Sequence, residues 1–233
     1  MNLHYTKQSV YIFKHMVKNN NKLLLGGLFV QNQNQQQNMQ GMQNMQGQIN
    51  FGGHELMDVH EAMGQVVGAL EQCLLYEQHI QDQELMQILQ RHRSFLTQLY
   101  NTAVDTLKTG QKPEVKTQTY LMEQSNDVVY GMQPSSPKSP KQSVNELNDE
   151  CISSFMMGNL KAMAGAFTTT ALEATNPVLR RVFADSVPNV IEMAYEIFLY
   201  QNKNQYYQVP QLAQQDMQTY MNSFSPIQGT MPQ

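Results

Sequence analysis

The sequence predicts an all-α protein made of two antiparallel helical hairpins joined by a long proline-rich crossover. Three observations support this prediction. Apolar residues recur at helical spacing in four long segments. Gly110 and Asn176-Pro177 stand where such segments stop or start, as helix-ending glycine and helix-starting proline do. A stretch with four prolines separates the segments into two pairs. We therefore expect one folded region with polar, loosely ordered ends.

Residues 1–50 are expected to form a disordered tail. Residues 31–48 are almost wholly Gln, Asn, Met and Gly, a composition that cannot bury enough apolar surface to offset chain entropy. We interpret this tract as a solvated arm, with association through ladders of side-chain amides as the alternative. The apolar run before it lacks the cleavage site of a signal peptide. We hypothesise that translation starts at Val30, so that residues 1–29 are not translated and Gly26-Gly27 reflects a ribosome-binding sequence.

The first hairpin is predicted over residues 51–110. Its first helix, from His54 to Ile80, carries two rows of apolar residues at heptad spacing. The rows are Leu56, Met63 and Leu70, and Val59, Val66 and Cys73. The pattern restarts after Gln81-Asp82 and stops at Gly110, which is placed to end a helix. Two antiparallel helices follow from this pattern.

Residues 111–142 are predicted to be a Pro/Ser-rich crossover. A connection of this length between two hairpins fits the single long crossover of a ferritin-like four-helix bundle, since up-down-up-down bundles use short loops throughout. Tyr120 and Tyr130 are expected to seat the crossover on the bundle. We therefore expect the segment from Tyr120 to Pro140 to lie along the bundle surface.

The second hairpin is predicted over residues 143–208. Ser143 and Glu146 have the spacing of a capping box and predict the start of the third helix. Small residues at about four-residue spacing on this helix predict a close approach by a neighbouring helix. They are Gly158, Ala162, Gly165 and Ala166, with Phe155 before them. Asn176-Pro177 ends this helix and starts the fourth.

The apolar face of the fourth helix is expected to be Val178, Leu179, Val182, Phe183, Val190, Ile191, Ala194, Ile197 and Phe198. Residues 209–233 are predicted to hold a short helix, over residues 211–221, that packs on the outside, and a loose tail.

Residues 148–207 carry a recognisable series of landmarks. They are Gly158 to Ala166, Thr175-Asn176-Pro177, Leu179-Arg180-Arg181 and Tyr206-Tyr207. In these landmarks the chain resembles the spore coat protein F family of endospore-forming bacteria, and in particular its coat-F-like branch with an N-terminal hairpin. The resemblance implies a structural role for the motif residues Asn176, Pro177, Leu179, Arg180 and Arg181. It also implies synthesis in the cytoplasm of a sporulating cell, a structural role in the spore coat, and other coat proteins as partners, with a homo-oligomer as a further expectation.

Composition argues against two other classes of partner. A net charge of -4 with 15% charged residues leaves no basic surface to replace the counterions of nucleic acid, so no nucleic-acid binding is expected. No segment reaches the roughly 20 apolar residues of a membrane-spanning helix, so no span is expected. Cys73 and Cys151 lie on apolar stripes, which predicts buried free thiols in a reducing compartment.

A ferritin-like bundle invites a test for a dimetal site. Such a site needs a Glu-x-x-His motif on each of two helices, and the chain contains none. His54, Asp58 and Glu61 share one helical face and are candidate ligands of a surface metal. We favour a structural interpretation, in which acidic residues near the helix start complement the helix dipole. No metal and no cofactor are therefore expected.

The remaining polar candidates are a possible pair and a tyrosine group. Glu77 and His92 lie near one level of the first hairpin and are expected to form a buried hydrogen bond. Tyr195, Tyr200, Tyr206 and Tyr207 are the candidate interaction residues. The resemblance favours exposed rings available for contact or cross-linking, and the alternative is that they complete helix faces. No catalytic residues are found, so we expect a non-enzymatic coat component, with a ferritin-like metal-binding protein and an adaptor for another coat or germination protein as alternatives.

Overall fold

The computed structural model describes residues 51–227 of the 233-residue chain. The tail predicted over residues 1–50, with the start proposed at Val30, lies outside the described residues, as do residues 228–233. The described part is helical and contains no β-strand. Its helices are α2 (Gly53–Tyr76), α3 (Gln83–Thr109), the 3-10 turn η1 (Val144–Glu146), α4 (Asp149–Glu173), α5 (Pro177–Lys203) and α6 (Gln214–Met221). The all-α fold class is thereby confirmed.

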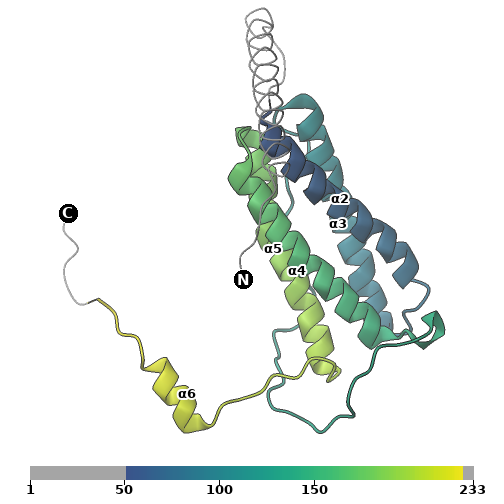
Figure 1. Cartoon of the computed structure of the whole chain (residues 1–233), viewed down its shortest axis with the longest axis vertical. Helices are drawn as coiled ribbons and strands as arrows, with labels where there is room; N and C mark the ends of the chain where they lie inside the picture. Colours follow the sequence, from purple (N-terminus) through teal and green to yellow (C-terminus); the bar gives the residue numbers. More distant parts are fainter. Residues whose placement is uncertain (1–50, 228–233) are drawn as a thin grey trace, which may run out of the picture. The chain divides into compact units, whose positions relative to one another are not determined.

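Four long helices, α2 to α5, surround one apolar core (Figure 1). α2 packs against α3 and α4, and α5 packs against the same two helices. The centre holds large apolar side chains from α3, α4 and α5 and smaller ones from α2, and burying each large one stabilises the fold by about 1.5–3 kcal/mol. Among the largest fully buried apolar side chains are Leu85, Ile88, Ile152, Met163, Phe167, Phe183 and Met193.

The crossover runs the length of the bundle. At one end the backbone N–H of Gln81, just before α3, donates to the Asp149 carboxylate at the start of α4 (2.9 Å). At the other end the Asn176 side chain, at the start of α5, donates to the carbonyl of Gly110, just after α3 (3.2 Å). α3 and α4 therefore run in the same direction, and residues 111–148 must return along the bundle. This is the connection expected of a ferritin-like bundle.

Helix ends follow the sequence signals at both ends of α3 and at the start of α5, whereas α2 ends at Tyr76, four residues before the predicted end at Ile80. Asp82 caps α3, since its carboxylate accepts from the Glu84 N–H (2.8 Å), and Gly110 ends α3 with a φ of 63°, where glycine is unstrained. The predicted start of the third helix at Ser143 is wrong. Ser143 caps only η1, Leu147 is extended, and Asn148 caps α4 by accepting from the Cys151 N–H (3.1 Å).

Three of the four small residues of α4 do not face a neighbouring helix, so the predicted close approach is also wrong; only Ala166 is half-buried. Gly158, Ala162 and Gly165 are exposed, and a Cβ added at either glycine would meet nothing within 4 Å. Phe155 is exposed as well. The core face of α4 is instead made of larger side chains, which fill the space between the helices. They are Ile152, Met156, Met157, Leu160, Met163 and Phe167.

Two other apolar predictions need correction. Leu56 of α2 is 44% exposed, because a heptad row drifts by about 20° per repeat on a straight helix and carries its first member away from the core. Ile191 of α5 is 56% exposed, although Val190 beside it is buried. α6 forms within the predicted range but buries none of its side chains, so the expected packing on the bundle is not seen.

Candidate functional site

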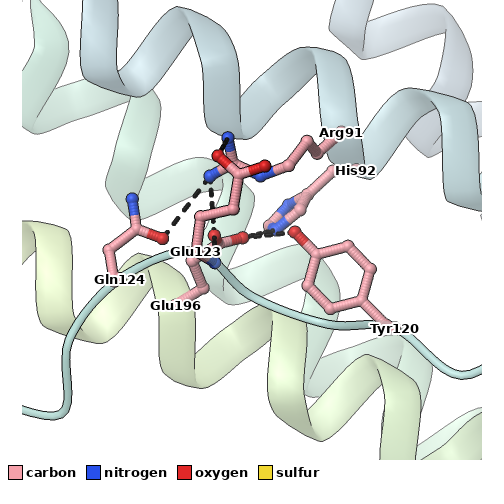
Figure 2. A network of polar contacts seen from close by, with 6 residues as sticks. All are labelled: Arg91, His92, Tyr120, Glu123, Gln124 and Glu196. Carbon is pink, nitrogen blue, oxygen red and sulfur yellow. Dashed lines mark hydrogen bonds and ion pairs between the residues drawn. The ribbon is translucent and has the colours of Figure 1, made fainter.

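A buried carboxylate on α5 is the centre of a polar network between α3, α5 and the crossover (Figure 2). Glu196 has no exposed surface. Its Oε1 accepts from Arg91 Nη2 (2.7 Å) and from the Glu123 backbone N–H (3.2 Å). Its Oε2 accepts from His92 Nε2 (3.0 Å) and from the Tyr120 hydroxyl. Every donor to this carboxylate comes from the chain itself.

The network holds one negative charge in the protein interior. Burial alone would raise the pKa of Glu196, but hydrogen bonds from His92, Tyr120 and Arg91 outweigh burial and lower it to about 2. Burial lowers the pKa of His92, so the ring is neutral and its Nε2 donates its proton to the ionised Glu196. Burial also raises the pKa of the Tyr120 hydroxyl. One arginine thus neutralises one carboxylate, and three neutral donors, His92, Tyr120 and the Glu123 backbone N–H, complete its hydrogen bonds.

The crossover is fixed to α5 through a segment that we call the strap, residues 118–131. Asn189 accepts from the Tyr120 N–H (2.8 Å) and donates to the Gln118 carbonyl (2.9 Å). Asn202 accepts from the Val129 N–H (2.6 Å) and donates to its carbonyl (2.9 Å). Together with Glu196, these side chains hold the strap at three points on α5. The prediction that the segment from Tyr120 to Pro140 lies along the bundle is confirmed for residues 120–131, whereas residues 132–140 are exposed.

Tyr120 anchors the strap in the core. Its ring is buried, and it meets the edge of Phe95 with ring centroids 5.3 Å apart. Tyr130, expected to play the same part, is exposed and only its backbone bridges to Val209. Tyr130 therefore does not seat the crossover through its ring.

The predicted pair of Glu77 and His92 is wrong. Glu77 pairs with Arg93 Nη1 (2.9 Å) at a partly exposed position, and His92 pairs with Glu196. His92 and Arg93 are consecutive on α3, so their side chains point about 100° apart around the helix. Sequence reasoning missed Glu196, and the signal that could have found it is a pair of polar residues on an apolar helix face. The pair is Asn189 and Glu196, seven residues apart on the same face of α5.

A second polar junction gathers the landmark residues at the hinge. Glu55 of α2 is fully buried and accepts from the Gly52 N–H (3.0 Å), the Thr175 hydroxyl (2.5 Å) and the Asn176 N–H (2.9 Å). Asn176 Oδ1 in turn caps α5 by accepting from the N–H groups of residues 178 and 179 (3.0 Å each). Because Asn176 also donates to Gly110, one end of each of the four long helices lies at this junction: the starts of α2 and α5 and the ends of α3 and α4. Burial would raise the pKa of Glu55, but these hydrogen bonds lower it.

The other motif residues are divided between surface and core. Pro177 is the first residue of α5, and Leu179 is fully buried. Arg180 is exposed, and Arg181 forms an exposed ion pair with Asp185 one turn later (3.3 Å). The motif thus supplies a helix start and one core contact, and it leaves two cationic side chains on the surface.

The four candidate tyrosines have different surroundings. Tyr200 is fully buried and donates to Asp82 Oδ2 (3.0 Å), so the expectation that it is available on the surface is wrong. Its position on the core side of α5 faces the start of α3. Tyr206 is half-buried against the Tyr200 ring. Tyr195 and Tyr207 both contact Phe198, at centroid distances of 5.6 and 5.4 Å, and they line one groove.

The candidate metal ligands stay at the surface. His54 and Glu61 are exposed and Asp58 is half-buried, and residues 51–227 contain no group of three or more acidic, His or Cys side chains arranged to hold a metal. Both cysteines are free; Cys73 is buried, which raises the pKa of its thiol to about 11. Cys151 is only half-buried, so its predicted burial is wrong, because the first turn of α4 lies at the edge of the bundle.

The relationship to known proteins agrees with this architecture. A family model for the Coat F domain matches residues 148–210, which run from the cap of α4 to just past α5. The chain is 49% identical over 201 residues to the spore coat protein F-like protein YhcQ of Bacillus subtilis, across 86% of this chain and 93% of that protein. The chain belongs to the coat F family. The resemblance drawn from its landmarks is thereby confirmed.

The fold of this coat F family member has also been seen in a crystal structure. A candidate spore coat protein of Bacillus halodurans superposes with a TM-score of 0.51 at 10% identity, across 71% of this chain and 96% of that one. At this identity the likeness concerns the fold. Among the helices described for the present coat F protein, none combines the length and the apolar character needed to cross a bilayer.

Proposed function

We propose that this coat F protein is a structural component of the bacterial endospore coat, which acts by binding other coat proteins and not by catalysis. Family membership supports the location, since the relatives at hand are named as spore coat proteins. The proposal that the protein is not a catalyst rests on the contacts in the interior of the bundle. The buried carboxylate there already accepts four hydrogen bonds from the chain itself.

This interior argues against the ferritin-like metal-binding alternative. The Arg91 guanidinium lies 2.7 Å from Glu196 Oε1, where a metal ion bound to this carboxylate would meet a like charge. His92 directs its Nε2 to the same carboxylate and has no free lone pair there for a metal. These contacts favour a structural role for the network, in which it holds the crossover against the bundle. Stoichiometric iron or manganese in the purified protein would revive the metal-binding alternative.

Fractionation of purified spores tests the proposed location. Spores are stripped by alkaline detergent, and the coat extract, the stripped core and the mother-cell lysate are probed for the protein with an antibody. We expect enrichment in the coat extract. Recovery only from the core or from the mother cell would contradict the coat assignment and favour the adaptor alternative.

A further inference from the structure

An apolar groove of about 390 Å³ runs between the outer faces of α4 and α5. Ala164 forms part of the α4 side, and Ile191 and Ala194 form part of the α5 side. Tyr195, Phe198 and Tyr207 close one end as a row of contacting rings. No part of residues 51–227 covers this groove, and Ile191 is 56% exposed on its rim. The groove thus offers concave apolar surface to a partner.

The same chain contains one helix, α6, that does not pack against the rest of the described residues. α6 has eight residues, no side chain at its start that accepts a capping hydrogen bond, and no buried residue. A helix this short is marginal in water without packing against another surface. Its apolar side chains are Met217, Tyr220 and Met221, at the i, i+3 and i+4 spacing of one helix face, and Phe224 follows three residues after the helix ends. Tyr220 is 72% exposed and Phe224 is 90% exposed.

Charge also matches between the groove and this helix. Lys161 is the charged side chain that lines the groove, and within the described residues it forms no ion pair; its Nζ lies 5.8 Å from the centre of the Tyr207 ring. Asp216 is the charged residue of α6 and lies one turn before Tyr220. α6 thus has an apolar face and one acidic residue, and the groove is apolar with one basic residue, so the two surfaces are complementary. This is the helix-in-groove mode of recognition.

We propose that α6 of one copy of this protein docks in the α4–α5 groove of a second copy. The connection to α6 disfavours docking within one chain. Gly131 N–H donates to the Val209 carbonyl (2.8 Å) and Gln133 N–H donates to the Gln208 side chain (2.5 Å), which ties residues 208 and 209 to the crossover. Four residues, 210–213, then remain before α6, with a reach of about 14 Å. The chain would have to reverse within them, beginning at Pro210, to enter its own groove.

The contact joins two different surfaces, so a bound pair keeps one free groove on one copy and one free α6 on the other. Such contacts either close reciprocally into a dimer or continue from copy to copy. The inference deepens the proposed function by naming one partner of the coat component. Its failure would leave the coat assignment standing, because association is measured on purified protein and location on spores.

The test uses the full chain and two exposed substitutions. Ile191→Glu places a charge in the groove, and Tyr220→Glu places one on α6. We expect the unmodified protein to associate as its concentration rises in sedimentation velocity, and each variant alone to remain monomeric. An equimolar mixture of the two variants should form a one-to-one dimer, since the Tyr220→Glu chain supplies an intact groove and the Ile191→Glu chain an intact α6.

Matched variants make the result specific. Leu172→Glu changes an exposed residue of α4 outside the groove and should associate as the unmodified protein does. Lys161→Glu should weaken association at least tenfold, and Lys161→Glu combined with Asp216→Lys should recover most of it. A monomeric unmodified protein would overturn the proposal. A mixture that stays monomeric, which is the result of docking within one chain, would overturn it as well.

Discussion

Glu55, near the start of α2, accepts a hydrogen bond of 2.9 Å from the backbone N–H of Asn176, 121 residues later. Asn176 is the residue that caps α5, and its side chain also donates to the carbonyl of Gly110 at the end of α3. One carboxylate and one amide side chain therefore tie both hairpins together at one end of the bundle. The family landmark Asn-Pro acts in this junction as a connector as well as a helix start.

Removing the charge at this junction should destabilise the fold. Glu55→Gln is expected to lower the free energy of unfolding by about 1–3 kcal/mol, because a neutral amide with one acceptor oxygen cannot satisfy three buried donors. Urea unfolding followed by circular dichroism measures the change. Glu61→Gln, at an exposed position of the same helix, is the control and should change stability by less than about 0.5 kcal/mol. Equal stability of the two variants would refute the connector role.

The strap should depend on Glu196. Glu196→Gln is expected to cost about 3 kcal/mol, because it removes the buried one of the two charge partners of Arg91 and disturbs the bonds to Tyr120 and His92. Limited proteolysis should then cut within the strap at protease concentrations that leave the unmodified protein intact. Glu123→Gln removes only the exposed partner of Arg91 and should cost at most about 1 kcal/mol. An intact strap in Glu196→Gln would show that the other anchors suffice.

Stability should decrease in mild acid because of His92. Its folded pKa is lowered below the usual 6.5, so the unfolded chain binds a proton near that pH while the folded chain does not. The free energy of unfolding should therefore fall as the pH drops from about 7 to 5. The lowered pKa of Glu196 adds a second loss as the pH falls from 4.5 toward about 2.

The contribution of His92 can be separated from that of Glu196 by measuring the free energy of unfolding of two variants over this pH range. His92→Gln should lack the decrease between pH 7 and 5, whereas His60→Gln, at an exposed position of α2, should keep it. Parallel pH profiles for all three proteins would assign the decrease to other groups.

Tyrosine reactivity should follow burial and not position in the sequence. Tyr120 and Tyr200 are expected to resist nitration by tetranitromethane, since burial raises the pKa of both hydroxyls and shields the rings. Tyr207 and Tyr220 are exposed in the single chain and should react at protein concentrations too low for two copies to associate. Peptide mass spectrometry measures the yield at each site, with protein in urea as the fully reactive control. Nitration of Tyr200 as fast as Tyr220 would contradict its buried position.

Replacing glycine by alanine should change the stability of the fold in opposite directions at two kinds of site. Gly158→Ala is expected to stabilise the protein by about 0.5–1 kcal/mol, because the position is an exposed helix interior with open space around it. Gly110→Ala should destabilise it by about 1–2 kcal/mol, because a φ of 63° strains any residue with a Cβ. Thermal unfolding of both variants distinguishes these effects. If Gly158→Ala destabilised the protein, the result would support the close helix contact that the sequence predicts at this position.

Features of local origin could be predicted from the residues alone. Helical periodicity, Asp82, Gly110 and Asn176-Pro177 specify where three of the four long helices start or stop, because caps and proline act within a turn of their own position. The length and prolines of the crossover indicated the bundle topology. The landmark series in the second hairpin indicated the family.

The pairing of the polar residues depends on long-range packing and could not be predicted from the sequence. Glu196 receives donors from residues about 70 to 105 positions away, and periodicity carries no information about partners at that distance. Rotation of each helix about its axis was likewise set by packing, since the larger side chains of α4 took the core and left Gly158 and Gly165 outside. The same choice placed Tyr200 inside and Tyr207 on the groove, although both belong to one tyrosine-rich segment. Long-range burial therefore decides which polar and aromatic side chains hold the fold and which remain available to a partner.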